Sequence, residues 1–316
     1  MAREEVWLEK AGGARRGRRA GRVSAARRAG CDGAMRGYRQ RDAALPGRST
    51  TLACMSASAR ILFCGDLVGP AGRRALMRTL PGLRERHDPT FVVVNGENVA
   101  GGFGITPKLA DDLFEAGVDV ITLGNHAYRH REIYPYLDEQ ARILRPANYL
   151  LGQPGHGHTI VSRDGVRLAV INLSGNVFMT AGRSAFAQAD TLLAELRGKT
   201  DHILVDMHAE ATSEKVAMGW HLDGRVTAVL GTHTHVPTAD ARVLPGGTAY
   251  ITDVGMTGAR GGVLGVKRDL AVGALVTQMP VRFVPADDDP WLMAVLVSAS
   301  EPQRADSIEQ LLIPAG

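Results

Sequence analysis

The chain has 316 residues, of which 45% are hydrophobic and 22% are charged, and its formal net charge is +4 at pH 7. This composition is typical of a globular protein with a full core and not of a disordered or membrane protein. No apolar run approaches the roughly 18 residues that a membrane-spanning helix needs, so we expect no membrane partner. The three cysteines, Cys31, Cys54 and Cys64, form no Cys-x-x-Cys motif, which favours a reducing compartment and therefore the cytoplasm.

Residues 1–58 are rich in Arg, Ala and Gly without a helical or strand period, which predicts a disordered basic tail. Residues 1–55 hold 13 basic and 5 acidic side chains, whereas the remainder holds 24 basic and 28 acidic ones. Three hypotheses for the tail are an RNA-binding arm, a transit peptide, and translated sequence upstream of a start at Met55. We favour the last, because Met55 stands just before the first predicted strand and because early acidic residues oppose a transit peptide.

Strands and helices alternate after this tail, which predicts parallel strands joined by helical crossovers. The first half contains predicted strands at 61–64, 91–94 and 118–123, and predicted helices at about 69–86, 107–116 and 131–140. A hairpin is expected next, in which 159–161 and 168–172 pair around a turn at Asp164-Gly165.

The second half continues with more strands than helices. Helices are predicted at 184–197 and 212–220, strands at 202–206, 226–230, 248–252, 281–284 and 292–297, and a Gly-rich loop at 255–265. We therefore expect an α/β fold in which two packed mixed sheets are flanked by helices. It would form one domain over 59–300, and residues 301–316 would be a C-terminal tail.

Several predicted strands end in side chains that commonly bind metal ions. These are Asp66, Glu97, Asn98, Asn125, His126, His208, His233 and His235. An open α/β sheet gathers its ligand site at the carboxyl ends of its strands, so we expect these side chains to converge. Neighbouring buried carboxylates would repel each other, and a bound cation removes that repulsion. His233 and His235 are two positions apart, so both can face one ion only if the chain there is not an extended strand.

The donor types narrow the choice of metal. Carboxylate, amide and imidazole groups without a thiolate favour Mn²⁺, Fe, Zn²⁺ or Co²⁺ over Ca²⁺ or a Cys-rich structural zinc. Eight candidates exceed what one ion needs, so we expect two divalent or mixed-valence ions about 3.5 to 4 Å apart that share a carboxylate. Such a pair turns a bridging water into hydroxide and clamps phosphoryl oxygens, which makes phosphate-ester hydrolysis the natural reaction class.

Six motifs follow one another between about Arg60 and Ser298. They are Gly65-Asp66, Asn95-Gly-Glu97-Asn98, Gly124-Asn125-His126, Asp206-Met-His208-Ala-Glu-Ala-Thr-Ser-Glu-Lys215, Gly231-Thr-His233-Thr-His235 and Thr252-Asp253-Val-Gly-Met256. Together they resemble the calcineurin-like metallophosphoesterases, and within them the YmdB subfamily of bacterial phosphodiesterases. The wider superfamily has a His two residues after the first Asp and an Asp as the bridging ligand. This chain has no such His after Asp66 and has Glu97 as the bridging candidate, as in that subfamily.

The resemblance implies a four-layer αββα sandwich and a role for each site residue. One ion would be held by Asp66, Glu97, Asn98 and His235, and the other by Glu97, Asn125, His208 and His233, with Glu97 as the bridge. His126 would be the general acid that protonates the leaving alkoxide. The metals would be Fe or Mn, with Zn or Co as alternatives, and the substrates small phosphodiesters that include 2′,3′-cyclic nucleotides.

One position departs from the family pattern. After His126 the family has an aromatic and then an acidic residue, whereas this chain has Ala127-Tyr128-Arg129. Arg129 either leaves His126 without a carboxylate partner or itself contacts the substrate phosphate.

Other interpretations of the same residues remain. Asp66 and Glu97 are also suitable helix N-caps, and Asn98 and Asn125 suit left-handed turns. A dimetal amidohydrolase would use similar ligands, but its barrel needs eight regular βα units, which the predicted hairpin interrupts. A regulatory RNA- or protein-binding module with structural metals is a further alternative, and the sequence leaves a homo-oligomer open.

Overall fold

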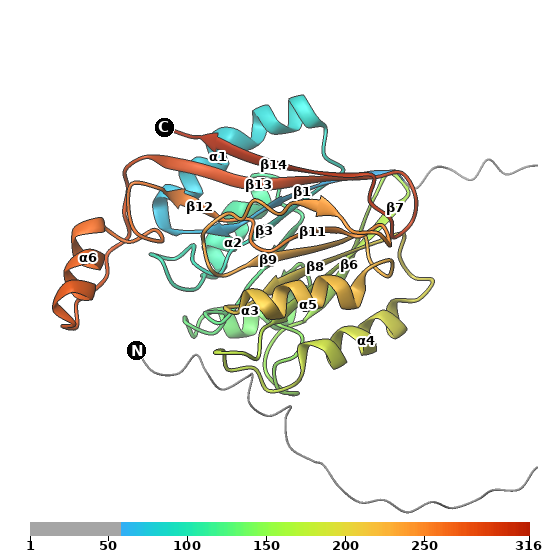
Figure 1. Cartoon of the computed structure of the whole chain (residues 1–316), viewed down its shortest axis with the longest axis horizontal. Coiled ribbons are helices and arrows are strands. Elements are labelled where there is room, and N and C mark those ends of the chain that lie inside the picture. Colours follow the sequence, from blue (N-terminus) through green and yellow to red (C-terminus); the bar gives the residue numbers. More distant parts are fainter. Residues whose placement is uncertain (1–57) are drawn as a thin grey trace, which may run out of the picture. The chain divides into compact units, whose positions relative to one another are not determined.

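Two mixed β-sheets face each other in the part of the chain that the structure, a computed structural model, describes, which is residues 58–316 (Figure 1). The first sheet has the order β2 (Asp66–Leu67), β12 (Met256–Ala259), β13 (Pro290–Ala299), β1 (Ala59–Cys64), β3 (Phe91–Asn95), β4 (Val120–Thr122) and β5 (Ile143–Leu144), and β14 (Ser307–Pro314) pairs with β13. The second has the order β10 (Arg242–Val243), β11 (Ala249–Ile251), β9 (Ala228–Thr232), β8 (His202–His208), β7 (Val166–Ser174) and β6 (His158–Arg163). The predicted tail, with Cys31 and Cys54, lies outside the described residues.

Strand alternation divides the apolar side chains between the space inside the sheets and their outer faces. In β1, Ile61 and Phe63 pack between the two sheets, whereas Leu62 and Cys64 belong to the core under the helices of the first sheet. Both faces of the central strands are therefore buried, which explains why they are continuous apolar runs in the sequence.

Helices cover both outer faces. On the first sheet, α1 (Gly69–His87), α2 (Pro107–Glu115) and α3 (Ile133–Glu139) bury their apolar sides, and on the second α4 (Ala185–Leu196) and α5 (Thr212–Leu222) do so. Two of these helices begin at side-chain caps: the hydroxyl of Thr106 accepts the N–H of Leu109, and that of Ser184 accepts the N–H of Ala187. The layers therefore confirm the predicted α/β fold of two packed mixed sheets flanked by helices.

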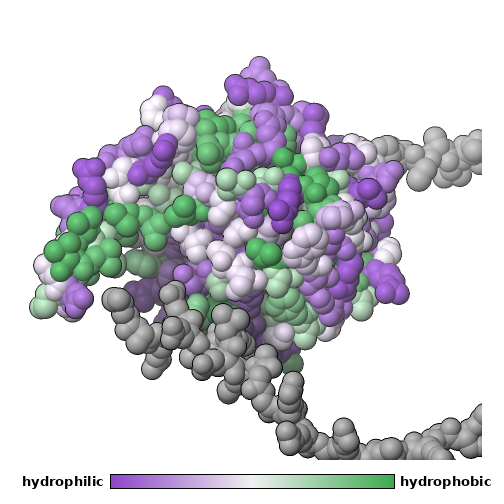
Figure 2. All heavy atoms as spheres, viewed as in Figure 1, coloured by the Kyte–Doolittle hydropathy of each residue, from purple (hydrophilic) through white to green (hydrophobic). Residues whose placement is uncertain are grey.

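A sixth helix, α6 (Arg268–Thr277), projects from the body of the domain (Figure 1) and was not predicted. Of its residues only Ala271 is buried, and Leu275 and Val276 are 75% and 76% exposed. Figure 2 shows this projection as a concentration of apolar residues on the viewed face. None of the helices in residues 58–316 is long and apolar enough to cross a membrane.

Three further segments differ from the sequence-based expectation. Residues 281–284 form no strand, because their exposed side chains have no partner strand beside them. The Gly-rich stretch 255–265 contains β12, which is held by distant pairings with β2 and β13 that leave no local signal. Residues 301–316, expected to be a tail, contain β14, which pairs with β13 from Ser307 to Pro314 and so extends the domain past 300.

Candidate metal centre

All eight residues predicted for the site lie at the carboxyl ends of strands from both sheets. Asp66 begins the short β2 just after the end of β1, Glu97 and Asn98 follow β3, and Asn125 and His126 follow β4. His208 ends β8, and His233 and His235 follow β9. Because the two sheets meet at this edge, side chains up to 169 positions apart in sequence approach each other there.

Glu97, His208 and His233 form the centre of this cluster, with one possible ligand atom of each within 4.8 Å of the others. The Nε2 atom of His208 lies 3.2 Å from Oε1 of Glu97 and 3.1 Å from Nδ1 of His233. It also lies 3.0 Å from Oδ1 of Asn125. One imidazole nitrogen carries at most one proton and can satisfy only one of these three neighbours, whereas a cation among them would be coordinated by several.

Asp66 is fully buried in the same cluster, with its Oδ1 atom 3.8 Å from Nδ1 of His208. Its Oδ2 accepts the main-chain N–H of His233 at 3.0 Å, and its Oδ1 has no hydrogen-bond partner among the described residues. A buried carboxylate oxygen without a donor is costly, so its presence is evidence for a positively charged ligand. The residues present thus fit the divalent metals that the donor set predicts.

Asn98 and His235 also lie in this cluster. Nδ2 of Asn98 lies 3.2 Å from Nε2 of His235 and 3.2 Å from Oε1 of Glu97. The Nδ1 atom of His235 lies 3.2 Å from the carbonyl oxygen of Leu264, which leaves Nε2 as the lone-pair nitrogen that faces the cluster. A half-turn of the Asn98 amide would present its oxygen to the same point, as a metal ligand requires.

The charges of the cluster act strongly on one another. Burial raises the pKa of Asp66, and the nearby Glu97 raises it further. Burial also opposes ionisation of Glu97, but His208 and His126 outweigh it and hold the pKa of Glu97 well below its usual range. Burial lowers the pKa of His208, but the surrounding carboxylates outweigh it and raise that pKa to about 9. Burial and the adjacent His208 lower the pKa of His233 to about 3.

The His-Thr-His turn has the irregular backbone that two histidines two positions apart need in order to face one point. His233 has φ 92° and His235 has φ 64°, both in the left-handed region that non-glycine residues rarely adopt. This breaks the alternation of β9 and lets both rings face the cluster. Such backbone conformations persist where the surroundings hold them, and here Asp253 accepts hydrogen bonds from Thr234 between the two histidines.

A buried network behind His208 orients its ring. The Nδ1 atom lies 2.9 Å from the hydroxyl of Thr232, which donates to Oδ1 of Asp206 at 2.6 Å. Asn95 donates to the other Asp206 oxygen at 3.0 Å, and burial raises the pKa of Asp206 to about 6. The network leaves Nε2 of His208 directed at Glu97, as supporting hydrogen bonds to metal-bound histidines usually do.

Four supporting residues stand in the sequence motifs without a predicted role. They are Asp206, Glu210, Lys215 and Asp253. Glu210 lies 3.0 Å from Nε2 of His233, on the far side of that ring from His208. Lys215 and Asp253 form a fully buried ion pair behind the His-Thr-His turn. For Asp206, Lys215 and Asp253 the signal is a charged residue in or just after a buried strand or on the buried side of a helix, where only a partner makes a charge tolerable. Glu210 is exposed and gives no such signal.

Gly124 shows why the third motif begins with glycine. A Cβ atom at this position would collide with Nε2 of His208 and Oε2 of Glu97. The backbone therefore passes directly against the cluster, and only glycine leaves the space between these two groups open.

His126 lies at the edge of the cluster with its ring in contact with solvent. Its Nδ1 lies 3.0 Å from Oδ1 of Asn98 and 3.6 Å from Oε1 of Glu97, and its main-chain N–H donates to Glu97. Its ring meets that of Phe103 edge-on, with centroids 5.1 Å apart. Glu97 thus supplies the carboxylate partner, and Arg129 stacks over the Phe103 ring at 5.9 Å.

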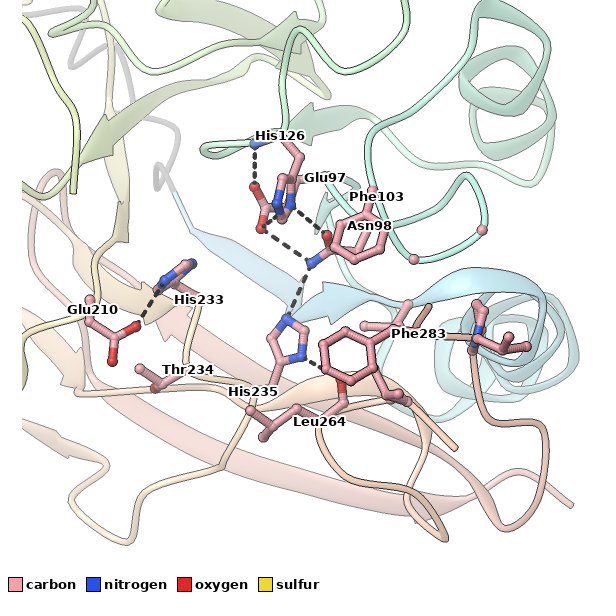
Figure 3. Close-up of a pocket in the computed structure, with 17 residues that line it drawn as sticks. Glu97, Asn98, Phe103, His126, Glu210, His233, Thr234, His235, Leu264 and Phe283 are labelled. Atoms are coloured by element: carbon pink, nitrogen blue, oxygen red, sulfur yellow. Dashed lines mark hydrogen bonds and ion pairs between the residues drawn. The ribbon is translucent and has the colours of Figure 1, made fainter. Parts of the chain in front are cut away.

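A cavity of about 280 Å³ opens beside the cluster (Figure 3). One side is polar and is formed by cluster residues together with Glu210 and Thr234. The other side is apolar and includes Phe103, Leu264 and Phe283. In Figure 3 the rings of Phe103 and Phe283 lie beside Asn98 and His235, away from Glu210 and His233. The arrangement suits a ligand with a charged end at the cluster and an apolar or aromatic body.

Comparisons with known proteins agree with this geometry. The sequence model of the family described as YmdB-like protein matches residues 62–311. A 2′,3′-cyclic-nucleotide 2′-phosphodiesterase from Bacillus subtilis (strain 168) is 47% identical over 255 residues, which cover 80% of this chain and 97% of the relative.

Two solved structures resemble the fold closely. One, of a protein from Thermus thermophilus that is described as hypothetical, is 41% identical with a TM-score of 0.77, and the match covers 81% of this chain and 100% of that one. The other, described as a novel phosphatase from Mycoplasma pneumoniae, is 31% identical with a TM-score of 0.76, and the match covers 82% and 95%. The chain is therefore a metallophosphoesterase and belongs to the YmdB-like family.

Proposed function

We propose that this chain hydrolyses phosphodiesters, including 2′,3′-cyclic nucleotides, with two transition-metal ions held by the cluster. The observation that carries the proposal is the buried Oδ1 of Asp66, which lacks a hydrogen-bond donor beside a second buried carboxylate and two histidines. The 2′,3′-cyclic-nucleotide activity in the name of the Bacillus subtilis relative supports the choice of substrate.

The cluster divides into two overlapping sets of ligands. Asp66, Glu97, Asn98 and His235 would hold one ion, and Glu97, Asn125, His208 and His233 the other. Glu97 would be shared, which its position supports, since its Oε1 lies 3.2 Å from both Nδ2 of Asn98 and Nε2 of His208. When bound, such a pair of ions supplies an activated water and neutralises charge on the phosphate. The mixture of oxygen and imidazole donors favours Fe or Mn, with Zn or Co as alternatives.

His126 is our candidate for the general acid. Its Nδ1 lies 3.0 Å from Oδ1 of Asn98, and its Nε2 lies 3.2 Å from Nδ2 of Asn125. An Asn98 amide turned to bind a metal ion would place an N–H donor against Nδ1, so that Nε2 would carry the proton for the substrate. The ring lines the cavity, so a proton on it can reach a leaving oxygen held there. Phe103 fixes the plane of the ring by its edge-on contact.

Two alternatives lose support. A dimetal amidohydrolase would need a (β/α)₈ barrel, and the chain instead forms two packed mixed sheets. A binding module that only stores its metals would bind ligand without turnover, whereas the Bacillus subtilis relative is named for a phosphodiesterase activity. RNA as a partner, a homo-oligomeric state and a cytoplasmic location remain predictions, the last from cysteine usage.

The test combines elemental analysis with a panel of phosphomonoesters and phosphodiesters, assayed with and without added Mn²⁺. We expect two metal equivalents and metal-dependent hydrolysis of diesters, including 2′,3′-cyclic nucleotides. Two bound equivalents without turnover of any diester would contradict the proposal and favour a binding module.

A further inference from the structure

The cluster has an opening on each of two sides. Beyond the cavity that Phe103 and Phe283 line, a second hollow of about 350 Å³ is bordered by Asn125, Tyr149, Phe178, Met179, Thr180 and His233. Both volumes are near the small end of the roughly 300–1,000 Å³ that ligand pockets occupy. The first is called the Phe283 pocket below, and the second the Phe178 hollow.

Two consecutive residues of one loop separate the two spaces. Asn125 borders the Phe178 hollow, and His126 borders the Phe283 pocket. His233 borders both. A phosphate at the cluster would therefore have the Phe283 pocket on one side and the Phe178 hollow on the other.

Each space is bordered by an exposed aromatic ring. Phe283 is 45% exposed, and Phe178 is 88% exposed. The Phe178 loop is nevertheless anchored, because the Glu214 carboxylate accepts the main-chain N–H groups of Asn176 at 2.8 Å and Val177 at 3.1 Å. Exposed rings beside a phosphate site are typical of proteins that stack nucleobases.

We infer that the enzyme takes linear phosphodiesters with a nucleoside on each side of the phosphate, in addition to cyclic nucleotides. The inference rests on the proposed phosphodiesterase function. In a 2′,3′-cyclic nucleotide both ester oxygens belong to one ribose, so its single base occupies the Phe283 pocket alone. A linear dinucleotide places one nucleoside in that pocket and the other in the Phe178 hollow.

The position of His126 also determines which bond breaks. A water oxygen forms the new bond to phosphorus, and the bond from phosphorus to the oxygen of the Phe283-pocket nucleoside breaks. That oxygen takes the proton of His126, and His126 is reprotonated from solvent, to which the attacking water has lost its proton. The products are an alcohol in the Phe283 pocket and a phosphomonoester of the nucleoside in the Phe178 hollow.

The experiment compares two substrates, 2′,3′-cyclic AMP and the linear dinucleotide adenylyl-3′,5′-adenosine, with the metal-loaded full chain. Stacking of one base on an aromatic side chain is worth roughly 5- to 150-fold in binding or kcat/KM. Phe283→Ala should lower kcat/KM for both substrates by such a factor. Phe178→Ala should lower kcat/KM for the dinucleotide relative to the cyclic nucleotide by such a factor. Trp220→Ala, which removes an exposed ring on α5 that borders neither space, is the matched control and should change neither rate.

A second readout does not depend on turnover. In the metal-loaded His126→Ala chain, calorimetry should find that Phe178→Ala weakens dinucleotide binding more than cyclic-nucleotide binding. The inference is overturned if the cyclic nucleotide is hydrolysed but the dinucleotide is not, or if Phe178→Ala leaves the ratio of the two rates unchanged. Failure of both substrates with two metals bound would instead count against the proposed function itself.

Discussion

The ammonium group of Lys215 lies 2.7 Å from the carboxylate of Asp253, and both side chains are fully buried. The same carboxylate accepts hydrogen bonds from the main-chain N–H of Thr234 at 3.1 Å and from its hydroxyl at 2.6 Å. Thr234 stands between His233 and His235, whose backbones have positive φ. The ion pair therefore holds in place the turn from which both histidines reach the cluster.

Replacing Lys215 by Met should destabilise the fold strongly. The change leaves the Asp253 carboxylate buried without its cation, which typically costs about 3 to 5 kcal/mol. Urea unfolding measures the loss. Arg60→Met is the control, because Arg60 pairs with Asp88 at 2.8 Å on the surface, where side-chain exposures are 46% and 87%. That change should cost under about 1 kcal/mol. Similar values for the two variants would refute the role given to the buried pair.

The metal content of two variants should distinguish Glu97, the proposed shared ligand, from Asp66, a proposed ligand of one ion only. Because Glu97 would contact both ions, Glu97→Ala should lose metal from both positions. Asp66→Ala removes a ligand of one ion only and should keep the other. Elemental analysis of the purified variants gives the equivalents per chain. Two full equivalents in Glu97→Ala would be incompatible with a bridging role.

His126→Ala should keep both metals but lose turnover. A positioned general acid contributes roughly 10²- to 10⁴-fold to the rate. The loss should be large for a diester with an alkoxide leaving group. It should be small for a nitrophenyl diester, because nitrophenolate departs without a proton. Equal losses on the two substrates, measured as kcat, would argue that His126 acts on the structure of the site and not as an acid.

Gly124→Ala should disable the cluster without unfolding the domain. The added methyl group would collide with His208 and Glu97, so both side chains must move apart from their present positions. We expect loss of metal and of diester hydrolysis, measured together on one preparation. Gly82→Ala is the matched control, since Gly82 lies on α1 with nothing within 4 Å of the added Cβ. A fully active Gly124→Ala chain would mean that the cluster tolerates a wider spacing than the structure has.

Local sequence signals are sufficient to find the residues at the strand ends. Asp66, Glu97 and His208 each stand at the end of an apolar run that is buried on both faces, so the strand and its terminal side chain could be predicted together. Packing of the two sheets then brings these ends to one edge. This explains why motifs far apart in sequence predicted one site.

The remaining features depend on contacts between distant segments. Phe103 and Phe283 line one cavity although 180 positions separate them, and neither stands in a motif. Phe283 lies in 281–284, which has the apolar residues of a strand but no partner strand beside it. For β14 the reverse holds, since pairing with β13 makes a strand of residues expected to form a tail. Whether either of these segments forms a strand therefore depends on the presence of a partner strand more than on its own residues.

The most direct test of the central claim is a crystal structure of the Mn²⁺-loaded chain with anomalous scattering recorded above the manganese edge. We predict two anomalous peaks, one on each side of the Glu97 carboxylate, the first beside Asp66 and His235 and the second beside His208 and His233. A single peak that does not contact Glu97, or no peak among these residues, would contradict a two-metal phosphodiesterase.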